Sequence, residues 1–349
     1  MYTLEGMIKR FYWLPLLICL ITHSTYGQII TNSDIPIAPL QPTTYQGWTN
    51  AFKLRNAVLE LVVVPDVGRI VYMALNGGVN FFRLDEGLMG QVPAEMGGDS
   101  WMNFGGDWFW PVSQARWTEI AGKDWPPPPV LAERPWCGSA WKGADGSQYC
   151  LINREYGAPL HIKASRLIKL ECDKPVVTIR QKIESIGNSS IPVTLWNISQ
   201  VARPDQVVLP VDAQSIFSQG YKVLNFDQPG TNVLVSCGKS IVLNAATPGE
   251  YKLGSDAEQG WVAAVGKGYM VERAANKPCE APYPDGGCRV ECYVNSGLGY
   301  AEIETLSPER MLQAGECLEN TLTIQLAPLD KPTDECSTVV RIQKLLGEE

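Results

Sequence analysis

The stretch VLELVVVPDVGRIVYMALNGG, residues 58–78, decides the class of fold. It opens with Val58–Val64, a largely β-branched run of strand length that a proline ends. Val67-Gly68-Arg69 then forms a turn before a second strand-like run, Ile70–Leu75, which an Asn-Gly-Gly turn signal ends. Short strands joined by tight glycine turns predict a β-meander.

Strand-like runs rich in Val, Ile and Thr continue through the second half of the chain, with turn residues between them. They are Tyr149–Asn153, His161–Leu170, Val176–Glu184, Pro192–Val201, Asn232–Ser236, Trp261–Val265, Arg289–Val294, Tyr300–Thr305 and Leu318–Leu326. In Val176–Glu184 apolar and polar residues nearly alternate, as expected for a strand with one face in water. Only Val339–Glu348 predicts a helix.

This pattern predicts an all-β fold with few helices, in which one large β-sandwich domain spans residues 48–330. No internal repeat or linker divides that span. Residues 28–47 are polar and proline-rich, so we expect an extended lead-in there. Residues 331–349 form a C-terminal tail that carries the short helix.

The composition is that of a folded, acidic and turn-rich protein. The 349 residues carry a formal net charge of -8 and include 32 Gly and 25 Pro. The acidity and the lack of a basic run argue against a nucleic-acid partner. Because Gly and Pro recur so often, few stretches are long enough for a helix.

The N-terminus resembles a secretory signal peptide over residues 1–27. Lys9 and Arg10 precede a short apolar run, Phe11–Ile21, and small residues precede a cleavage point at Gln28. No later run approaches the ~20 apolar residues that a membrane helix needs. We therefore expect a secreted or periplasmic protein without an integral membrane segment in its mature chain.

Ten cysteines fit an oxidising compartment, and nine remain if Cys19 leaves with the signal. An odd number leaves at least one cysteine free or paired between chains. Local disulfides are expected within Cys279, Cys288 and Cys292, and between Cys137 and Cys150. A metal site would need more ligands than one mature histidine, His161, so no metal is predicted.

A long irregular segment between the strands is rich in tryptophan. Seven of the eleven tryptophans lie between Met89 and Gly143: Trp101, Trp108, Trp110, Trp117, Trp125, Trp136 and Trp141. The segment includes Gly105-Gly106-Asp107, whose carboxylate is followed by two indoles. Carboxylates bind sugar hydroxyls and indole faces cover the C–H face of a sugar ring. A single Trp is more often buried, but the cluster favours a carbohydrate in a ligand cleft.

Two further carboxylates lie in Tyr300–Thr305. In a strand, Glu302 and Glu304 point to the same face and Ile303 to the other. Such a pair is either a solvated outer face or a functional site in which mutual repulsion raises one pKa. The spacing alone leaves both interpretations open.

Several catalytic systems have no counterpart in the sequence. His161 lies in a strand-like run and is the only mature histidine, which leaves a Ser-His-Asp system without a base. The sequence contains no HExxH motif and no Gly-rich phosphate loop between a strand and a helix. No cofactor is predicted.

The motifs resemble an uncharacterised bacterial family of exported proteins that is grouped with the galactose mutarotase (aldose 1-epimerase) superfamily. The likeness spans Val58–Leu326. It rests on Gly105-Gly106-Asp107-x-x-Trp110-Pro111-x-x-Gln114, Trp125-Pro126-Pro127-Pro128, Glu302-Ile303-Glu304-Thr305-Leu306-Ser307-Pro308 and Gly315-Glu316. The resemblance implies a supersandwich of β-sheets with a sugar site on its concave face.

The resemblance also implies roles for particular residues. Glu304 matches the glutamate that acts as general base in mutarotases. The general acid there is a histidine, and Ile198 stands at the matching position. The other mutarotase histidine is absent as well, because Asn103-Phe104 precede the Gly-Gly pair. Ring opening needs a base and an acid, so the sequence supports sugar binding better than mutarotation.

The leading hypothesis is an exported carbohydrate-binding protein of mutarotase-like fold, with epimerase-like or related sugar chemistry left open. The alternatives are a non-catalytic carbohydrate-binding protein and an interaction module of the cell envelope. The ligand would be a small molecule or an oligosaccharide. If the chain is an enzyme, Glu304 is the base and Asp107 or a nearby tyrosine the acid. The predicted substrate-binding residues are Arg69, Trp108, Trp110, Gln114, Trp125 and Glu302.

Overall fold

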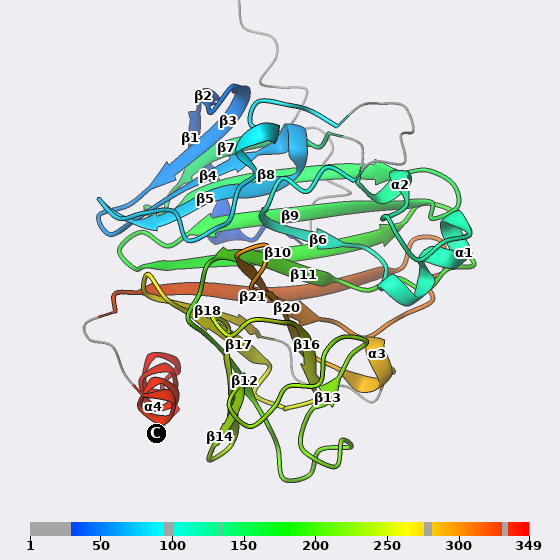
Figure 1. The fold of residues 1–349 in the computed structure, drawn as a ribbon. Coiled ribbons are helices and arrows are strands. Elements are labelled where there is room, and N and C mark those ends of the chain that lie inside the picture. Colours follow the sequence, from blue (N-terminus) through cyan, green and yellow to red (C-terminus); the bar gives the residue numbers. More distant parts are fainter. Residues whose placement is uncertain (1–28, 94–100, 133–134, 276–280, 330–333, 349) are drawn as a thin grey trace, which may run out of the picture.

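The computed structural model describes residues 29–93, 101–132, 135–275, 281–329 and 334–348. Two large antiparallel sheets face each other across a single core (Figure 1). The all-β prediction and the β-sandwich architecture are therefore confirmed. No helix in the described ranges is long and apolar enough to cross a membrane.

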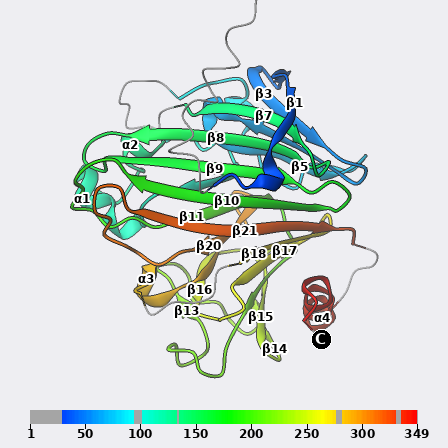
Figure 2. The same ribbon diagram turned by 180° about the vertical axis from the view of Figure 1, so that it is seen from behind.

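The larger sheet has eleven strands in the order β1-β7-β8-β9-β10-β21-β18-β17-β12-β15-β14. In that order their bounds are Pro36–Leu40, Cys137–Gly143, Gln148–Tyr156, Ile162–Leu170, Val176–Ser185, Cys317–Ala327, Tyr269–Ala274, Trp261–Val265, Gln206–Pro210, Ser240–Asn244 and Leu234–Cys237. The long strands β9, β10 and β21 run side by side through the middle of this sheet (Figure 2).

The second sheet has ten strands in the order β13-β16-β19-β20-β11-β6-β5-β4-β3-β2. In that order their bounds are Lys222–Val223, Glu250–Ser255, Val290–Asn295, Tyr300–Leu306, Trp196–Ala202, Gly106–Trp110, Arg69–Leu75, Leu59–Val64, Trp48–Arg55 and Thr43–Tyr45. The neighbours β11 and β20 are far apart in the sequence but pair over seven residues.

Helices are few and short, apart from one at the C-terminal end. The short ones are α1 (Trp117–Ala121), α2 (Pro129–Ala132), α3 (Pro284–Gly287) and the 3₁₀ turns η1 (Asn32–Asp34), η2 (Pro65–Val67), η3 (Glu86–Leu88) and η4 (Gln114–Arg116). The predicted C-terminal helix exists as α4 (Glu335–Leu346), and it begins four residues earlier than Val339. The Asp334 carboxylate accepts hydrogen bonds from the backbone N–H groups of Cys336 and Ser337, so it caps that earlier start.

The meander at residues 58–78 forms as the sequence indicates. Strands β4 and β5 are joined by η2 and by Gly68, whose φ of 67° is left-handed. A side chain at Gly68 would meet the Trp136 indole, since a Cβ there would lie 2.3 Å from Nε1. Glycine is therefore required at this turn both for its backbone conformation and for its lack of volume.

The described part of the lead-in, residues 29–47, is more regular than expected. Strand β1 pairs with β7 at the edge of the larger sheet, and β2 pairs with β3 at the edge of the second sheet. The polar composition of these residues fits exposed edge strands as well as it fits an extended segment. The predicted signal peptide lies outside the described residues.

Five cysteines were expected to form local disulfides, and for the four of them that the structure describes this expectation is wrong. Cys137, Cys150, Cys288 and Cys292 are free thiols, and Cys279 lies outside the described residues. Cys150 instead faces Ala140 across the β7–β8 pair, because the register of that hairpin places Cys137 opposite Asn153. Closeness in sequence therefore did not bring the two sulfur atoms together.

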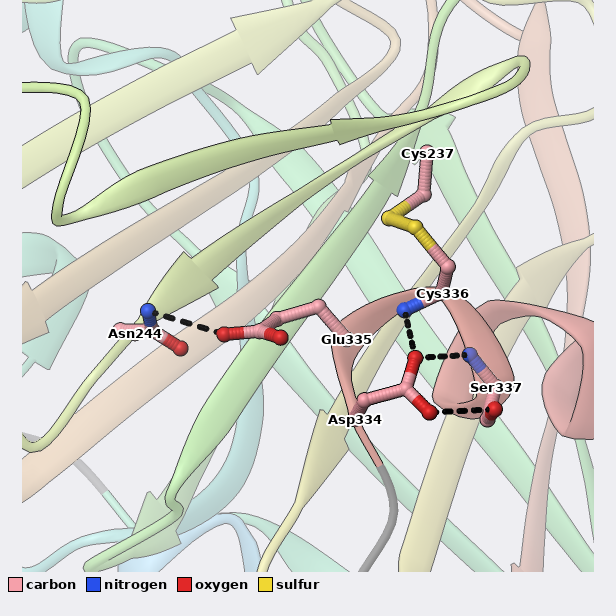
Figure 3. The surroundings of a disulfide bond; sticks show 6 residues. All are labelled: Cys237, Asn244, Asp334, Glu335, Cys336 and Ser337. Atoms are coloured by element: carbon pink, nitrogen blue, oxygen red, sulfur yellow. Dashed lines mark hydrogen bonds between the residues drawn. A yellow bond between two sulfur atoms is a disulfide. The ribbon is translucent and has the colours of Figure 1, made fainter.

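A disulfide joins Cys237 at the end of β14 to Cys336 in the first turn of α4 (Figure 3). The two cysteines are 99 residues apart in sequence. The bond fixes the C-terminal helix to the edge of the larger sheet. Val339 and Ile342 of this helix pack against the side of the larger sheet that faces away from the second sheet.

We predict that replacing both Cys237 and Cys336 with serine lowers the free energy of unfolding by about 2–4 kcal/mol, because the unfolded chain regains the entropy of a long loop. Urea denaturation under oxidising conditions measures this difference. Cys172→Ser is the matched control, since Cys172 is an exposed free thiol. An unchanged stability in the double variant would contradict the predicted contribution.

Candidate functional site

The candidate site is built on neighbouring strands of the ten-stranded sheet. Side chains alternate between the two faces of a strand, so β6, β11 and β20 each serve both faces. Ser199 of β11 is paired with Asp107 and Ile303, and these three side chains point toward the other sheet. Ile198 is paired with Trp108 and Glu304, and these three side chains point away from the other sheet. We call this second surface the outer face.

Three glutamates and one lysine gather on the outer face. Glu304 of β20 lies opposite Glu291 of β19, and the Lys252 ammonium from β16 contacts both carboxylates. Its Nζ atom is 3.0 Å from Glu291 Oε2 and 3.4 Å from Glu304 Oε2. Glu302 is one row further along, and its Oε1 accepts a hydrogen bond of 2.7 Å from Gln200 Nε2. We call these four residues, Glu291, Glu302, Glu304 and Lys252, the carboxylate cluster.

The charges in the carboxylate cluster do not balance. Burial alone would lower the pKa of Lys252, but Glu291 and Glu304 outweigh it and hold that pKa well above its ordinary value. Burial raises the pKa of Glu304 and, more strongly, that of Glu291, although Lys252 opposes both shifts. Burial thus outweighs the single ammonium, and both glutamates hold a proton more readily than a glutamate in water does.

Glu302 differs from Glu304 in accessibility. Burial, reinforced by the neighbouring charge of Glu304, raises the pKa of Glu302 to about 7. Its side chain is partly exposed, whereas Glu304 is fully buried. Glu304 Oε2 accepts a hydrogen bond of 2.6 Å from Trp196 Nε1 and is also close to Lys252. Of the two glutamates on β20, Glu302 is the one that solvent reaches and that titrates near neutral pH.

Indoles surround the carboxylate cluster. Trp108, Trp110 and Trp196 lie on the outer face, and the Lys252 ammonium is 5.0 Å from the centre of the Trp196 ring. The Arg69 guanidinium lies 3.9 Å above the Trp108 ring. Burial lowers the pKa of Arg69 to about 9, against the opposing charge of Glu302. The face thus combines aromatic surfaces with cations and carboxylates.

Segments from the Trp-rich region cover part of the outer face. The ring centre of Trp101 lies 5.4 Å from that of Trp110. The ring centre of Trp117, in α1, lies 5.6 Å from that of Trp110 and 6.4 Å from that of Trp196. Trp108 and Trp110 are consequently only about 5% exposed. These indoles form a packed layer, as single tryptophans usually do, so a ligand would have to bind at the edge of this layer or displace it.

Five polar atoms on the outer face have no hydrogen-bond partner within the described part of the chain. They are Trp108 Nε1, Gln200 Oε1, Glu304 Oε1 and both carboxylate oxygens of Glu291, of which Oε2 keeps its ion pair with Lys252. Leaving a buried polar group without a partner costs about 1–3 kcal/mol, and more when the group is charged. Folded proteins therefore seldom leave such atoms without water or a ligand. Their concentration on one face marks that face as the candidate site.

Asp107 lies elsewhere than the sequence analysis expects. As the candidate acid it would have to reach the same ligand as Glu304, but its side chain points between the sheets and is fully buried. Asp107 Oδ1 accepts a hydrogen bond of 2.5 Å from Arg166 of β9, and Oδ2 accepts bonds from Asn197 and Ser199. The placement follows from strand alternation, because Asp107 and Trp108 are adjacent in β6. Asp107 joins the two sheets and does not contribute to the outer face.

The Asp107–Arg166 pair belongs to a larger buried network between the sheets. Asn197 also donates a hydrogen bond to Glu272 of β18, and Thr305 donates to it at 2.6 Å. The Ser199 hydroxyl lies 3.1 Å from the other Glu272 oxygen, so its single proton serves either Glu272 or Asp107. Burial and the Asp107 charge raise the pKa of Glu272 to about 8. The network satisfies most of its members, which is what allows these polar groups to occupy the interior.

The other predicted residues divide into two groups. Arg69, Trp108, Trp110, Glu302 and Glu304 are brought together on or beside the outer face. Gln114 and Trp125 lie at the periphery: the Gln114 side chain approaches the Asp124 carbonyl, and Trp125 is 58% exposed beside Trp117. His161 precedes β9 in an exposed turn with a φ of 48°.

Sequence reasoning missed Lys252, Glu291, Trp196 and Gln200. Each lies in a strand of alternating pattern, where a polar or aromatic residue resembles an ordinary exposed position. Their shared face depends on pairing between strands that are distant in the chain, such as β16, β19 and β20. The only local signal was the unusual presence of Lys252 and Glu291 beside otherwise apolar strand residues.

Comparison with known proteins supports the fold. No protein-family model and no curated protein sequence matches the chain. The structure is similar to that of a putative aldose 1-epimerase from Escherichia coli K12, with a TM-score of 0.51, 13% identity and coverage of 80% of this chain and 99% of that chain. A putative mutarotase from Salmonella typhimurium gives a TM-score of 0.53, 9% identity and coverage of 84% and 97%.

A TPR-domain containing protein from Parabacteroides distasonis is similar as well, with a TM-score of 0.57 and 13% identity. The match covers 81% of this chain but 48% of that protein. At these identities the similarities show the fold alone. The chain has a galactose mutarotase-like β-sandwich fold.

We predict that Asp107→Ala lowers the free energy of unfolding by about 3–5 kcal/mol, because it leaves the fully buried Arg166 guanidinium without its counter-charge. Urea denaturation measures the loss. Lys53→Ala is the control: it breaks the Lys53–Glu60 ion pair, in which Lys53 is 49% exposed, and should cost less than about 1 kcal/mol. Equal losses in the two variants would contradict the structural role of Asp107.

Proposed function

We propose that this chain is an exported carbohydrate-binding protein whose ligand contacts the outer face of the ten-stranded sheet. The observation that carries the proposal is the set of unpartnered polar atoms beside indoles and the carboxylate cluster. A sugar supplies hydroxyl groups that donate to carboxylates and accept from ammonium and indole N–H groups. The similar structures named as a putative epimerase and a putative mutarotase support a carbohydrate-related function.

The first contact of the ligand would be with Glu302, the accessible carboxylate of β20. Gln200 donates a hydrogen bond to it, and the charges of Lys252 and Arg69 act on it. Glu304 is held by Trp196 and Lys252, so its role is to fix the ammonium where a ligand hydroxyl can reach it. This assignment separates a binding carboxylate from a positioning one.

Catalysis of mutarotation should be weak. The register places Ile198 directly opposite Glu304, where the resemblance expects an acid. An isoleucine side chain cannot transfer a proton, and a positioned acid typically contributes ~10²–10⁴-fold. Asp107 does not replace it, because that carboxylate lies between the sheets. Binding without efficient ring opening is therefore the function that the geometry supports best.

Export is part of the proposal and rests on the N-terminal sequence. The disulfide between Cys237 and Cys336 is consistent with an oxidising compartment. N-terminal sequencing of the mature protein tests export directly: a chain that begins near Gln28 supports it, and one that retains Phe11–Ile21 contradicts it.

We predict that calorimetric titration with a panel of saccharides detects binding, and that Glu302→Gln weakens it by about tenfold. The reason is the loss of one charge-assisted hydrogen bond. Glu319→Gln is the control, an exposed glutamate on the other sheet whose loss should leave affinity unchanged. Saccharide binding that neither Glu302→Gln nor Lys252→Met weakens would rule out this face.

Anomer exchange of glucose and galactose, followed by NMR, tests the prediction of weak catalysis. We expect little acceleration at enzyme concentrations that bind the sugar fully, because the acid position holds Ile198. Rapid exchange that Glu304→Gln abolishes would contradict this expectation and would mean that another group acts as the acid.

Binding should depend on pH through Glu302. Its pKa of about 7 lies above the ordinary value of 4.5, so the carboxylate is charged at pH 8.5 and protonated at pH 5.5. A charged acceptor binds hydroxyls more strongly, so affinity should fall as pH falls through 7. Titrations across this range check the direction. The dependence should disappear in Glu302→Gln, and an affinity that rises on acidification would contradict the assignment.

A further inference from the structure

A cavity of about 330 Å³ lies on the outer side of the eleven-stranded sheet, beside α4. It is lined by Pro210, Lys239, Ser240, Gln259, Trp261, Gln343 and Glu348. These residues come from β12, β15, β17, the turns that precede β15 and β17, and the C-terminal helix region, and none of them belongs to the carboxylate cluster. Its size is at the lower end of the range for small-molecule sites.

Helix α4 forms one wall of the cavity and the eleven-stranded sheet forms the other. Both ends of α4 are attached to that sheet. At the first turn, the disulfide joins Cys336 to β14, and Glu335 approaches Asn244 Nδ2 of β15 at 3.4 Å (Figure 3). Beyond the last turn, Glu348 forms an ion pair of 2.9 Å with Arg273 of β18. The cavity is therefore bounded by a covalently anchored helix.

Three side chains of the cavity lining each carry a buried polar atom that has no hydrogen-bond partner among the described residues. Ser240 Oγ and Trp261 Nε1 belong to side chains that are only 1% exposed. The third is Gln259 Oε1, whose amide nitrogen already donates to Asp212 Oδ1 at 3.2 Å. Buried groups of this kind are normally satisfied, so they indicate that the cavity holds a polar occupant.

The chemistry of these atoms defines the occupant. The Trp261 N–H only donates, Gln259 Oε1 only accepts, and the Ser240 hydroxyl does both. A molecule that satisfies all three must donate and accept several hydrogen bonds within a small volume. The two charged lining residues are of opposite sign, Lys239 and Glu348, and Glu348 is already paired with Arg273. The three groups without a partner are all uncharged, so they match the hydroxyl groups of a neutral ligand better than an ionised group.

We propose that this cavity, bounded by Ser240, Gln259, Trp261 and α4, is a second binding site that takes a small neutral polyhydroxylated molecule of monosaccharide size. The site does not depend on the carboxylate cluster, which lies on the other sheet. It would give the chain two independent contacts with carbohydrate, one on the outer side of each sheet.

The test uses saturation-transfer NMR and calorimetric titration of the full chain with D-glucose and D-galactose. At least one of these sugars should bind, and Ser240→Ala should weaken its binding at this site by about tenfold, the effect of one buried hydrogen bond. Trp261→Phe keeps an aromatic ring and removes the N–H, and it should weaken binding similarly. Glu302→Gln should leave this binding event unchanged.

Ser240→Ala also separates binding from folding. Ser240 Oγ makes no hydrogen bond to the described protein, so its removal should not lower the melting temperature. If Trp261→Phe does not fold, Ser240→Ala alone decides. Lys239→Met should change affinity less than twofold, and a loss above tenfold would overturn the assignment to a neutral ligand.

Other outcomes contradict the proposal outright. If neither sugar binds the full chain, or if binding is equally strong in Ser240→Ala and Trp261→Phe, the cavity is not a site for polyhydroxylated molecules. Sugar binding that only Glu302→Gln removes would overturn this second site and leave the proposed function intact. Sugar binding that only Ser240→Ala removes would support this second site and overturn the proposed function at the outer face.

Discussion

Strands β6, β11 and β20 divide their side chains between two environments, because successive residues of a strand point to opposite faces. One set forms the buried network of Asp107, Asn197 and Thr305 between the sheets. The other set places Trp108 and Glu304 on the outer face. A shift of one residue in any of these strands would exchange the two sets, so the polar network and the candidate site fix each other's register.

The buried network also explains how charged residues are tolerated in the core. Arg166 is fully buried, and its charge is compensated by Asp107, while Asn197 Oδ1 accepts a further hydrogen bond from it at 2.9 Å. Such a pair contributes little net stability over apolar residues, but its loss on one side is costly. Because it links β9 to β6 and β11, the pair holds the two sheets in one relative position. The positions of the side chains on the outer face therefore depend on the Asp107–Arg166 pair.

The sequence predicted the architecture well and the site partly. Alternating runs such as Val176–Glu184 and the Gly68 turn carry local information, and both appear as expected in β10 and in the β4–β5 connection. The disulfide was not predictable, since Cys237 and Cys336 are 99 residues apart and no local pattern links them. Nearness in sequence misled the assignment of Asp107, because adjacent residues of a strand face opposite ways. Lys252 and Glu291 needed the pairing of distant strands to become visible.

The central claim is that a sugar contacts the outer face at Glu302 and Lys252. The most direct measurement is a crystal structure of the protein soaked with mixed saccharides, compared with one without them. The account predicts a sugar whose hydroxyl groups lie within hydrogen-bond distance of the Glu302 carboxylate and the Lys252 ammonium. Ordered water alone at these atoms, at saccharide concentrations that saturate binding in solution, would contradict it.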